Sequence, residues 1–364
     1  MRKRAALIYG SVITGLTLLS GCVFQGEQSL QEMDPPQEQA STGQNNVENS
    51  ETTSNNGQET NQEQNQVVVE TNERQLYLLD ANGMVVPQTV LLPETETKEY
   101  AKQALEYLVK GGPITNVLPS GFEAVLPAGT EINSLNLMKD EGTLVVDVSK
   151  EFSEYRPEDE LKILQAMTYT LTQFESVERV KLQINGYDTD VMPVNGTPIS
   201  DGYSRANGIN LHVGDVVNLS DSKSVTVYYP TQHDDKVYYV PVTKRVKAND
   251  ENVYETIVQT LVNGPGFDLN LQQVFNEGAK LVEKPKYTDG VLKLTFNENV
   301  LNNFDDQAVL STEVMDSLVL SLTEQPGVEA VSVEVENIDQ VFSEQGEVLA
   351  EPVSRPQMVN TRRF

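Results

Sequence analysis

Residues 171–184 read LTQFESVERVKLQI, and the same pattern returns at residues 322–335 as LTEQPGVEAVSVEV. Each stretch runs from an apolar helix end through a turn into an alternating strand pattern. Two more stretches recur: LVKGGP at 108–113 returns as LVNGP at 261–265, and GTLVVD at 142–147 returns as GVLKLT at 290–295. The three offsets lie between 148 and 153 residues. Shared order and spacing indicate one globular unit that is built twice.

Each copy combines helix and strand patterns. The elements predicted for the first copy are a hairpin turning at Asn82-Gly83, a helix at 100–108, a hairpin at 132–148, a helix from Pro157 to Leu171 and a strand at 180–184. The second copy has helix patterns at 253–261 and 314–322. The sequence therefore predicts an α+β fold made of two tandem copies of a small mixed sheet, with two helices packed on one face.

Composition divides the chain into six expected segments. They are a signal peptide at 1–21, a tether at 22–73, a first unit at 74–186, a connector at 187–223, a second unit at 224–340 and a tail at 341–364. The connector is rich in turn residues and has one short strand pattern at 209–213. The tail has weak periodicity and is expected to fray.

The N-terminus carries the pattern of an export signal. Arg2, Lys3 and Arg4 precede an uncharged run at 5–19, and Ser20-Gly21 stands before Cys22. This order resembles the lipobox of bacterial lipoproteins, which implies cleavage between Gly21 and Cys22 and acylation of the Cys22 thiol. An uncleaved anchor helix is the alternative, but fifteen residues are short for a membrane span of about 20. Cys22 is the only cysteine, so neither an internal disulfide nor a cysteine metal site is expected.

The mature chain is strongly acidic. Residues 23–73 contain no Lys or Arg and ten acidic residues, which predicts a disordered tether with a reach of about 40 Å. The formal net charge is −28, and removal of the three positive charges in residues 1–21 would make it −31. This charge excludes nucleic acid as a partner and argues against broad binding to anionic lipid. Lipid on Cys22 would therefore hold the protein at the membrane.

Few residues offer chemistry. The two histidines are His212 in the connector and His233, which precedes Asp234 and Asp235 and would be a candidate for cation binding. Asp147 and Glu151 are spaced like a carboxylate pair, but the second copy has Thr295 and Asn299 there. No known catalytic motif is present. We expect no enzyme, with no catalytic residue, cofactor or metal site.

Several of these stretches carry a family resemblance. The Gly-Pro helix ends, LPAGT at 126–130, the strand after Gly142, TLTQF at 170–174 and the lipobox resemble the GerM family of sporulation and spore germination lipoproteins. The resemblance covers about residues 76–340 and implies two tandem GerM domains, similar to ring-building motifs. The second copy departs from the first, with NEGA at 276–279 and Asn337 in place of Gly186. These departures indicate that the two copies have specialised.

The resemblance also implies a function. It predicts a lipoprotein on the outer face of the cell membrane, in the space between mother cell and forespore. There it would serve sporulation and germination as a scaffold or assembly factor for a trans-envelope ring complex. The partners would be membrane lipid through Cys22 and protein components of the channel. A lipoprotein that binds or remodels peptidoglycan in the spore cortex or in germination remains the alternative. A solute-binding lipoprotein is disfavoured because the domains are small and the chain has no tryptophan.

Overall fold

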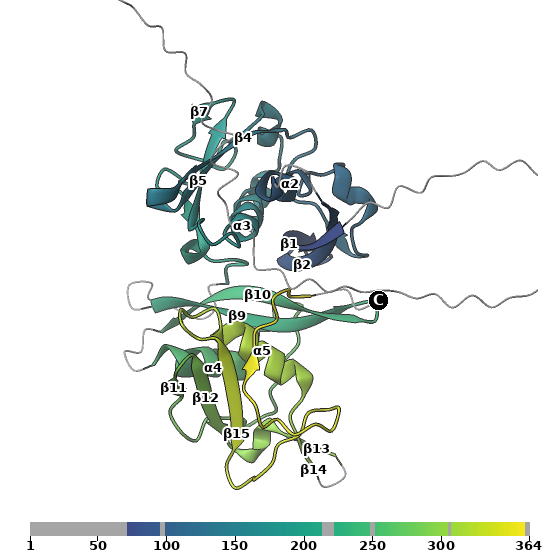
Figure 1. Cartoon of the computed structure of the whole chain (residues 1–364), viewed down its shortest axis with the longest axis vertical. Coiled ribbons are helices and arrows are strands. Elements are labelled where there is room, and N and C mark those ends of the chain that lie inside the picture. The colour runs from purple at the N-terminus through teal and green to yellow at the C-terminus, as the bar shows by residue number, and fades with distance from the viewer. Residues whose placement is uncertain (1–70, 95–98, 213–221, 248–251, 305–306, 361–364) are drawn as a thin grey trace, which may run out of the picture.

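Two α+β units follow one another along the chain and meet through their first hairpins (Figure 1). The computed structural model describes residues 71–94, 99–212, 222–247, 252–304 and 307–360. The first unit contains β1 (Thr71–Asp80), β2 (Val85–Pro93), α2 (Tyr100–Glu106), β3 (Phe122–Glu123), β4 (Ile132–Met138), β5 (Thr143–Val148), α3 (Glu160–Leu171), β6 (Arg179–Ile184), β7 (Tyr187–Asp188) and β8 (Tyr203–Ser204). The second contains β9 (Ser222–His233), β10 (Lys236–Lys247), α4 (Val253–Asn263), β11 (Lys286–Thr288), β12 (Val291–Phe296), β13 (Asn302–Phe304), β14 (Gln307–Val309), α5 (Thr312–Leu322), β15 (Ala330–Val335) and β16 (Val353–Ser354).

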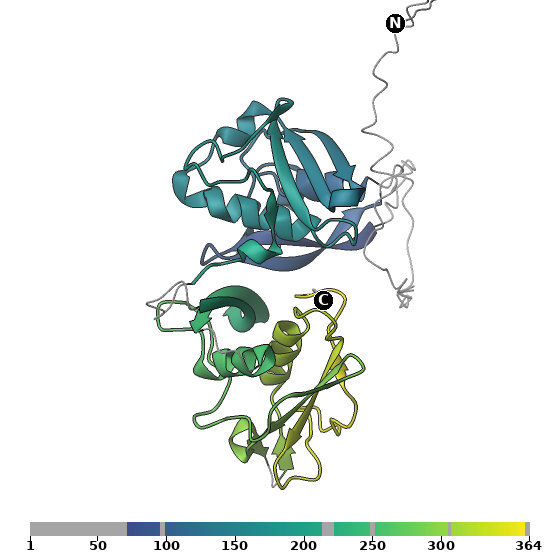
Figure 2. The same cartoon turned by 90° about the vertical axis from the view of Figure 1, so that its left-hand side faces the viewer.

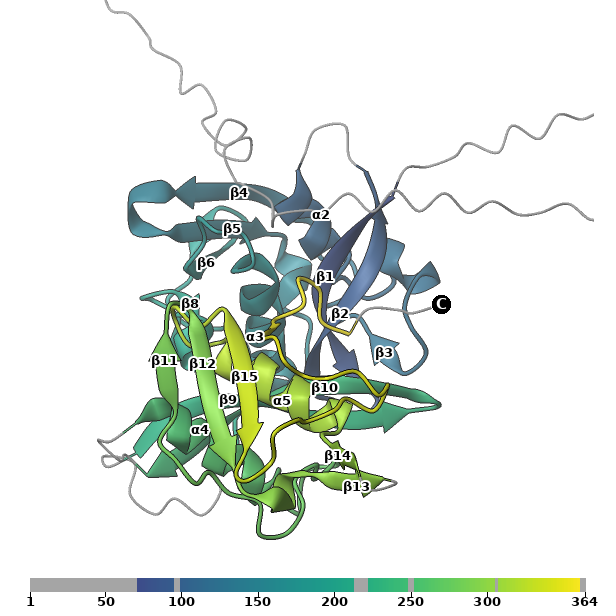
Figure 3. The same ribbon diagram turned by 60° about the horizontal axis from the view of Figure 1, so that its bottom comes forward.

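The main sheets of the two units have the same topology. The strand order is β4-β5-β6-β7 in the first unit, where β8 also pairs with β6, and β11-β12-β15-β16 in the second. The central pair is parallel in both, because α3 or α5 crosses over between its two strands. Figure 3 shows the second sheet lying across α4 and α5. The predicted α+β class and the duplication are confirmed.

The helices are covered on both sides. β1 and β2 form a separate sheet with β3, and α3 packs against β1 as well as β6. In the second unit the β9–β10 hairpin covers α4 and α5 in the same way (Figure 2). The sequence pattern predicted the two helices on one face of a single sheet. The second layer accounts for α3, which has buried side chains around most of its circumference, including Ile163, Ala166 and Tyr169.

The repeated glycine at the start of β5 and β12 has a conformational reason. Gly142 and Gly290 have φ of 58° and 82°, in the region that glycine adopts without strain. The carbonyl of each glycine accepts hydrogen bonds from the two backbone N–H groups that lead into the parallel partner strand. A Cβ on Gly142 would lie 2.8 Å from the side chain of Glu178. The glycine therefore fixes the register of the parallel pair in both copies.

The acidic start of α3 holds a neighbouring segment of the chain. Acidic residues in the first turn of a helix usually favour the positive end of the helix dipole. Glu160 is instead fully buried, and its carboxylate accepts hydrogen bonds from the backbone N–H groups of Asn195 and Thr197 at 2.6 and 2.9 Å. This carboxylate thus attaches the chain after β7 to the helix.

The predicted connector is largely part of the first unit's structure. β7 and β8 both pair with β6. The strand predicted at 209–213 is not found at 209–212: His212 makes only an isolated bridge to Lys244. Gly208 and Asn210 have positive φ values of 82° and 46°, which turn the chain out of a strand. Residue 213 lies outside the described part.

The C-terminal tail is ordered through residue 360, and the prediction that it frays is wrong for residues 341–360. β16 pairs with β15, and Val359 is 3% exposed. The Oγ1 of Thr89, in the first unit, donates to the carbonyl of Val359 at 3.0 Å. Periodicity did not reveal this segment because hydrogen bonds hold it, rather than an apolar stripe.

Candidate functional site

The predicted lipidation site, Cys22 with the cleavage position at Gly21, lies outside the described residues. Residues 22–70 of the predicted tether at 22–73 also lie outside them, whereas residues 71–73 belong to β1 and are not part of a disordered tether. In the part of the chain that the structure does describe, no helix is both long and apolar enough to cross a membrane. Anchoring through Cys22 therefore stays a prediction from the sequence.

The two histidines lie in different places. The Nε2 atom of His212 is 3.0 Å from a carboxylate oxygen of Asp268, which links the connector to the loop after α4. His233 lies at the tip of the β9–β10 hairpin, with its ring against Gly121 and its Nε2 3.8 Å from Asp234. Within the described ranges, no group of three or more His, Cys, Asp or Glu side chains is arranged to hold a metal ion.

Asp147 and Glu151 have separate structural partners. The carboxylate of Asp147 accepts a hydrogen bond from the backbone N–H of Gly186 at 2.8 Å, which closes the turn after β6. A hydrogen bond from Ser149, aided by Lys150, lowers the pKa of Glu151. Both carboxylates therefore stabilise turns at this edge of the sheet.

The residues that the structure does bring together lie where the two hairpins meet. We call residues 203–210 the first arm and residues 353–360 the second arm. The side-chain oxygen of Asn210, in the first arm, accepts from the N–H of Val85 at 2.8 Å. The side-chain nitrogen of Asn210 donates to the carbonyls of Val85 and Pro241, at 2.7 and 2.8 Å. One asparagine thus ties the edge of β2 to the edge of β10.

The second arm repeats this arrangement with the strands exchanged. The side-chain oxygen of Asn360 accepts from the N–H of Tyr239 at 2.9 Å, and its nitrogen donates to the carbonyls of Tyr239 and Pro87 at 3.0 and 2.7 Å. Asn210 bonds to both the N–H and the C=O of one residue on β2 and to one carbonyl on β10. Asn360 bonds to both the N–H and the C=O of one residue on β10 and to one carbonyl on β2. Both residues have positive φ, 46° and 56°.

This reciprocity is the mark of a two-fold relation between the units. We call the contact of β2 and β10 with both arms the joint. Its sequence signal was present but unnoticed: the first arm reads YSRANGIN and the second reads VSRPQMVN, 150 residues later. The joint also has contacts that are not repeated, including a 2.9 Å hydrogen bond from the hydroxyl of Tyr238 to Asp80.

A partly buried ionic cluster closes one side of the joint. Glu324, which follows α5, accepts hydrogen bonds from Tyr228 at 2.7 Å and from Arg355 at 2.9 Å. Arg205, from the first arm, lies 3.6 Å from the other carboxylate oxygen. The side chain of Glu324 is 17% exposed. A single carboxylate therefore receives an arginine from each arm.

The arginines of the cluster are also related by the two-fold. Each donates to a backbone carbonyl and to a threonine hydroxyl near the C-terminal end of a helix. These acceptors are Tyr169 O and Thr172 Oγ1 for Arg205, and Leu320 O and Thr323 Oγ1 for Arg355. Glu324 occupies the position of Gln173 in the first copy, 151 residues earlier. The charge at this position is thus specific to the second copy.

We expect the cluster to make stability depend on acid pH. Burial acts to raise the pKa of Glu324, but Arg355 and Arg205 outweigh it and hold that pKa below its usual range. The carboxylate then contributes stability above the unfolded-state pKa of about 4.3, and the contribution is lost as pH falls through the lower folded-state pKa. The melting temperature should decrease once the pH drops below about 4.3. This decrease should be smaller in a Glu324→Gln variant. Equal losses in both proteins would contradict this.

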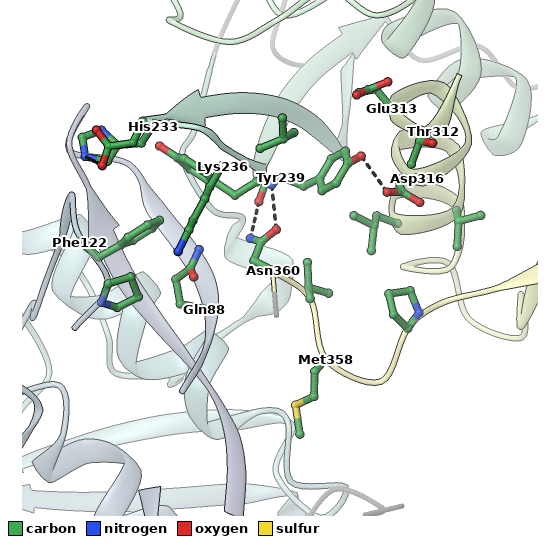
Figure 4. A pocket seen from close by; sticks show the side chains of 18 of the residues that line it. Gln88, Phe122, His233, Lys236, Tyr239, Thr312, Glu313, Asp316, Met358 and Asn360 are labelled. Carbon is green, nitrogen blue, oxygen red and sulfur yellow. Dashed lines mark hydrogen bonds and ion pairs between the residues drawn. The ribbon is translucent and has the colours of Figure 1, made fainter. Parts of the chain in front are cut away.

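A cavity of about 620 Å³ lies beside the joint, between β10, α5 and the second arm (Figure 4). The side chain of Tyr239 lines the cavity, and its hydroxyl donates a hydrogen bond to Asp316 at 2.8 Å. Burial, and then the carboxylate of Asp316, raise the pKa of Tyr239, so its hydroxyl stays protonated. The cavity has walls from both units, because Gln88 and Phe122 also line it.

Known proteins match this chain over most or all of its length. A family model named Germane, described as sporulation and spore germination, matches twice, at residues 75–190 and 226–340. The spore germination protein GerM of Bacillus subtilis (strain 168) is 45% identical over 371 residues, and the alignment covers 100% of both chains. The solved structure of the tandem GerMN domains of the sporulation protein GerM from Bacillus subtilis is also similar. It has a TM-score of 0.74 and 49% identity, and the match covers 80% of this chain and 100% of that one.

Proposed function

The chain belongs to the Germane family of sporulation and spore germination proteins, and from this membership we propose that it is a lipid-anchored assembly factor of the sporulating cell. The membership supports a role in sporulation and germination. Acylated Cys22 would hold the chain on the outer face of the membrane, in the space between mother cell and forespore. The two folded units would bind protein components of a trans-envelope ring complex.

The observation that carries this proposal is the duplicated unit with its tied joint. Two modules that are held in one orientation present two surfaces at a fixed spacing, and this arrangement favours a scaffold. The sheets end in β4 and β11, which lie away from the joint (Figure 1). Edge strands of this kind accept a strand from another protein. We therefore assign the contacts with ring components to these edges.

The two-fold at the joint bears on how a ring would form. Neighbours in a ring meet through two different surfaces, whereas two-fold partners meet through the same surface. The contact between the two units of one chain is thus unlike a step of a ring. A ring contact would have to use surfaces outside the joint, in agreement with the role that we give to β4 and β11.

We propose no catalytic role. The family is one of sporulation and germination proteins rather than an enzyme family. Asp147, the strongest acid-base candidate in the sequence, is bonded to the backbone N–H of Gly186. Binding therefore remains the basis of the proposal.

Three strains test this function. One carries a deletion of the gene, one carries Cys22→Ala, and one carries the neighbouring Ser20→Ala as a matched control. We expect Cys22→Ala to move the protein from the membrane fraction to the soluble fraction, because acylation needs the thiol. Fluorescent fusions of the ring components should lose their septal localisation in the deletion strain and recover it with Ser20→Ala. Normal localisation in the deletion strain would refute the assembly role. Retention of the Cys22→Ala protein on membranes would refute the lipid anchor.

A further inference from the structure

The cavity beside α5 exists where the second copy has lost a tyrosine. In the first copy, Tyr203 is 4% exposed and its hydroxyl bonds to Gln165 on α3. The equivalent positions in the second copy are Val353 and Asp316, 150 and 151 residues later. Val353 has a much smaller side chain, and it lines the 620 Å³ cavity. This difference opens space at a place that the first copy fills.

The cavity has an apolar floor and an acidic wall. Val319, Leu320 and Val353 contribute to the floor. Glu313 and Asp316 stand on the α5 side (Figure 4), and Glu344 is held at the same end of the helix by a 2.8 Å hydrogen bond from Thr312. His233, Asp234 and Lys236 also line the cavity, so a positive charge on a ligand is favoured at the wall of Glu313 and Asp316 rather than throughout the cavity.

A strand edge runs along the cavity. Asn360 pairs with both the N–H and the C=O of Tyr239, as a residue of a neighbouring strand would. Alternate residues of an antiparallel pair point their backbone groups to the same edge, so those of Val237 point the same way as those of Tyr239. Val237 lines the cavity and is 45% exposed. A peptide can therefore extend the pairing that the Asn360 side chain begins.

We propose that this cavity binds an extended segment of a partner protein that carries an arginine or lysine two residues away from an apolar residue, so that both side chains point to the same side of the added strand. The segment adds a short strand at Val237 and places its apolar side chain on the floor. Its basic side chain meets Glu313 and Asp316. The volume lies in the range of about 300–1,000 Å³ that is usual for ligand pockets. This site stands whether or not the chain assembles a ring, because it is measured with the isolated protein.

Peptide binding to the full chain tests the proposal. The probe is a fluorescein-labelled hexapeptide, Ser-Arg-Ser-Val-Ser-Arg with blocked ends, and the comparison peptide has Glu in place of both Arg. We expect the arginine peptide to bind at least tenfold more tightly, as measured by fluorescence anisotropy. Methylation of the central backbone nitrogens should weaken binding at least tenfold, because a strand partner needs its N–H groups.

Variants of the protein locate the site. The double variant Val353→Tyr, Asp316→Gln copies the first unit, and we expect it to fill the cavity and weaken binding at least tenfold. Its thermal midpoint should stay at or above that of the unmodified chain, which separates a filled cavity from a misfolded protein. Glu313→Gln should weaken binding severalfold, whereas Glu298→Gln, an equal charge change on an exposed side chain of the same unit, should not.

Other outcomes overturn the proposal. Equal binding of the two peptides, or full binding to a folded filled-cavity variant, would place the peptide elsewhere. If the arginine peptide binds neither the full chain nor a chain ending at Asn360, the site is excluded. If only the chain ending at Asn360 binds it, residues 361–364 (TRRF) are the occupant, and the partner segment is excluded.

Discussion

Replacement of Glu324 by glutamine is expected to lower the free energy of unfolding by about 3 kcal/mol. This is the lower end of the range for breaking a buried ion pair, because Arg205 and Arg355 remain 33% and 25% exposed and keep some contact with water. The amide would leave both guanidinium groups facing one another without an anion. Urea unfolding followed by circular dichroism measures the change.

The loss of stability in Glu324→Gln should come from the ionic cluster, and removal of a carboxylate charge elsewhere should have a smaller effect. Glu334 on β15 forms an ion pair with Lys293, and both side chains are about half exposed, at 52% and 41%. Glu334→Gln removes the same charge from the same unit and should cost less than about 1 kcal/mol. If the two variants lose equal stability, the cluster does not hold the joint. A double change of Arg205 and Glu324 to uncharged residues should cost less than the sum of the single changes.

Local patterns were enough to predict the main helices and strands of the first unit and the helices of the second, but not the β9–β10 hairpin. The strand expected at 180–184 is β6 at 179–184, and the helix expected from Pro157 begins as a short 3-10 turn and continues as α3. The hairpin at Asn82-Gly83 turns where the two residues indicate. These elements depend on neighbours within a few residues, so the period of apolar side chains and the turn chemistry identify them. Duplication then supplied the second copy.

The joint could not be predicted from the same signals. Arg355 and Tyr228 are 127 positions apart in sequence, yet they share Glu324. Contacts of this kind depend on how two complete units meet, and no local period encodes that. The one available signal was the repeat of Ser204-Arg205 as Ser354-Arg355, followed by an asparagine after the same interval. A comparison of the two copies that ends at β6 and β15 leaves this repeat out.

The candidate sites divide in the same way. Asp147 and His233 were selected from residue type, and the structure gives each a local role in a turn. The cavity beside α5 combines residues of both units, and its key feature is an absence, a valine where the first copy has Tyr203. Such a difference has meaning only after the two arms are aligned in space. Duplicated domains therefore reveal function best at the positions where their copies stop matching.

Replacement of either joint asparagine by glycine is expected to cost about 2–4 kcal/mol, because three backbone groups lose their partner and an unpaired buried group costs about 1–3 kcal/mol. Glycine keeps the positive φ of 46° at Asn210 and 56° at Asn360 without strain, so the loss combines the hydrogen bonds with the greater freedom of glycine in the unfolded chain. The two single losses should agree within about 1 kcal/mol, since the bonds are reciprocal. Chemical unfolding of both variants gives the values.

Asn337→Gly provides the matched control. Asn337 also has a positive φ, 62°, and its side chain is exposed at the end of β15. The same substitution there should change stability by less than about 0.5 kcal/mol. The double variant of Asn210 and Asn360 should lose more than the sum of the single losses, because either asparagine alone still holds β2 against β10. A loss confined to one asparagine would mean that the two-fold arrangement is geometric only, and that one arm carries the joint.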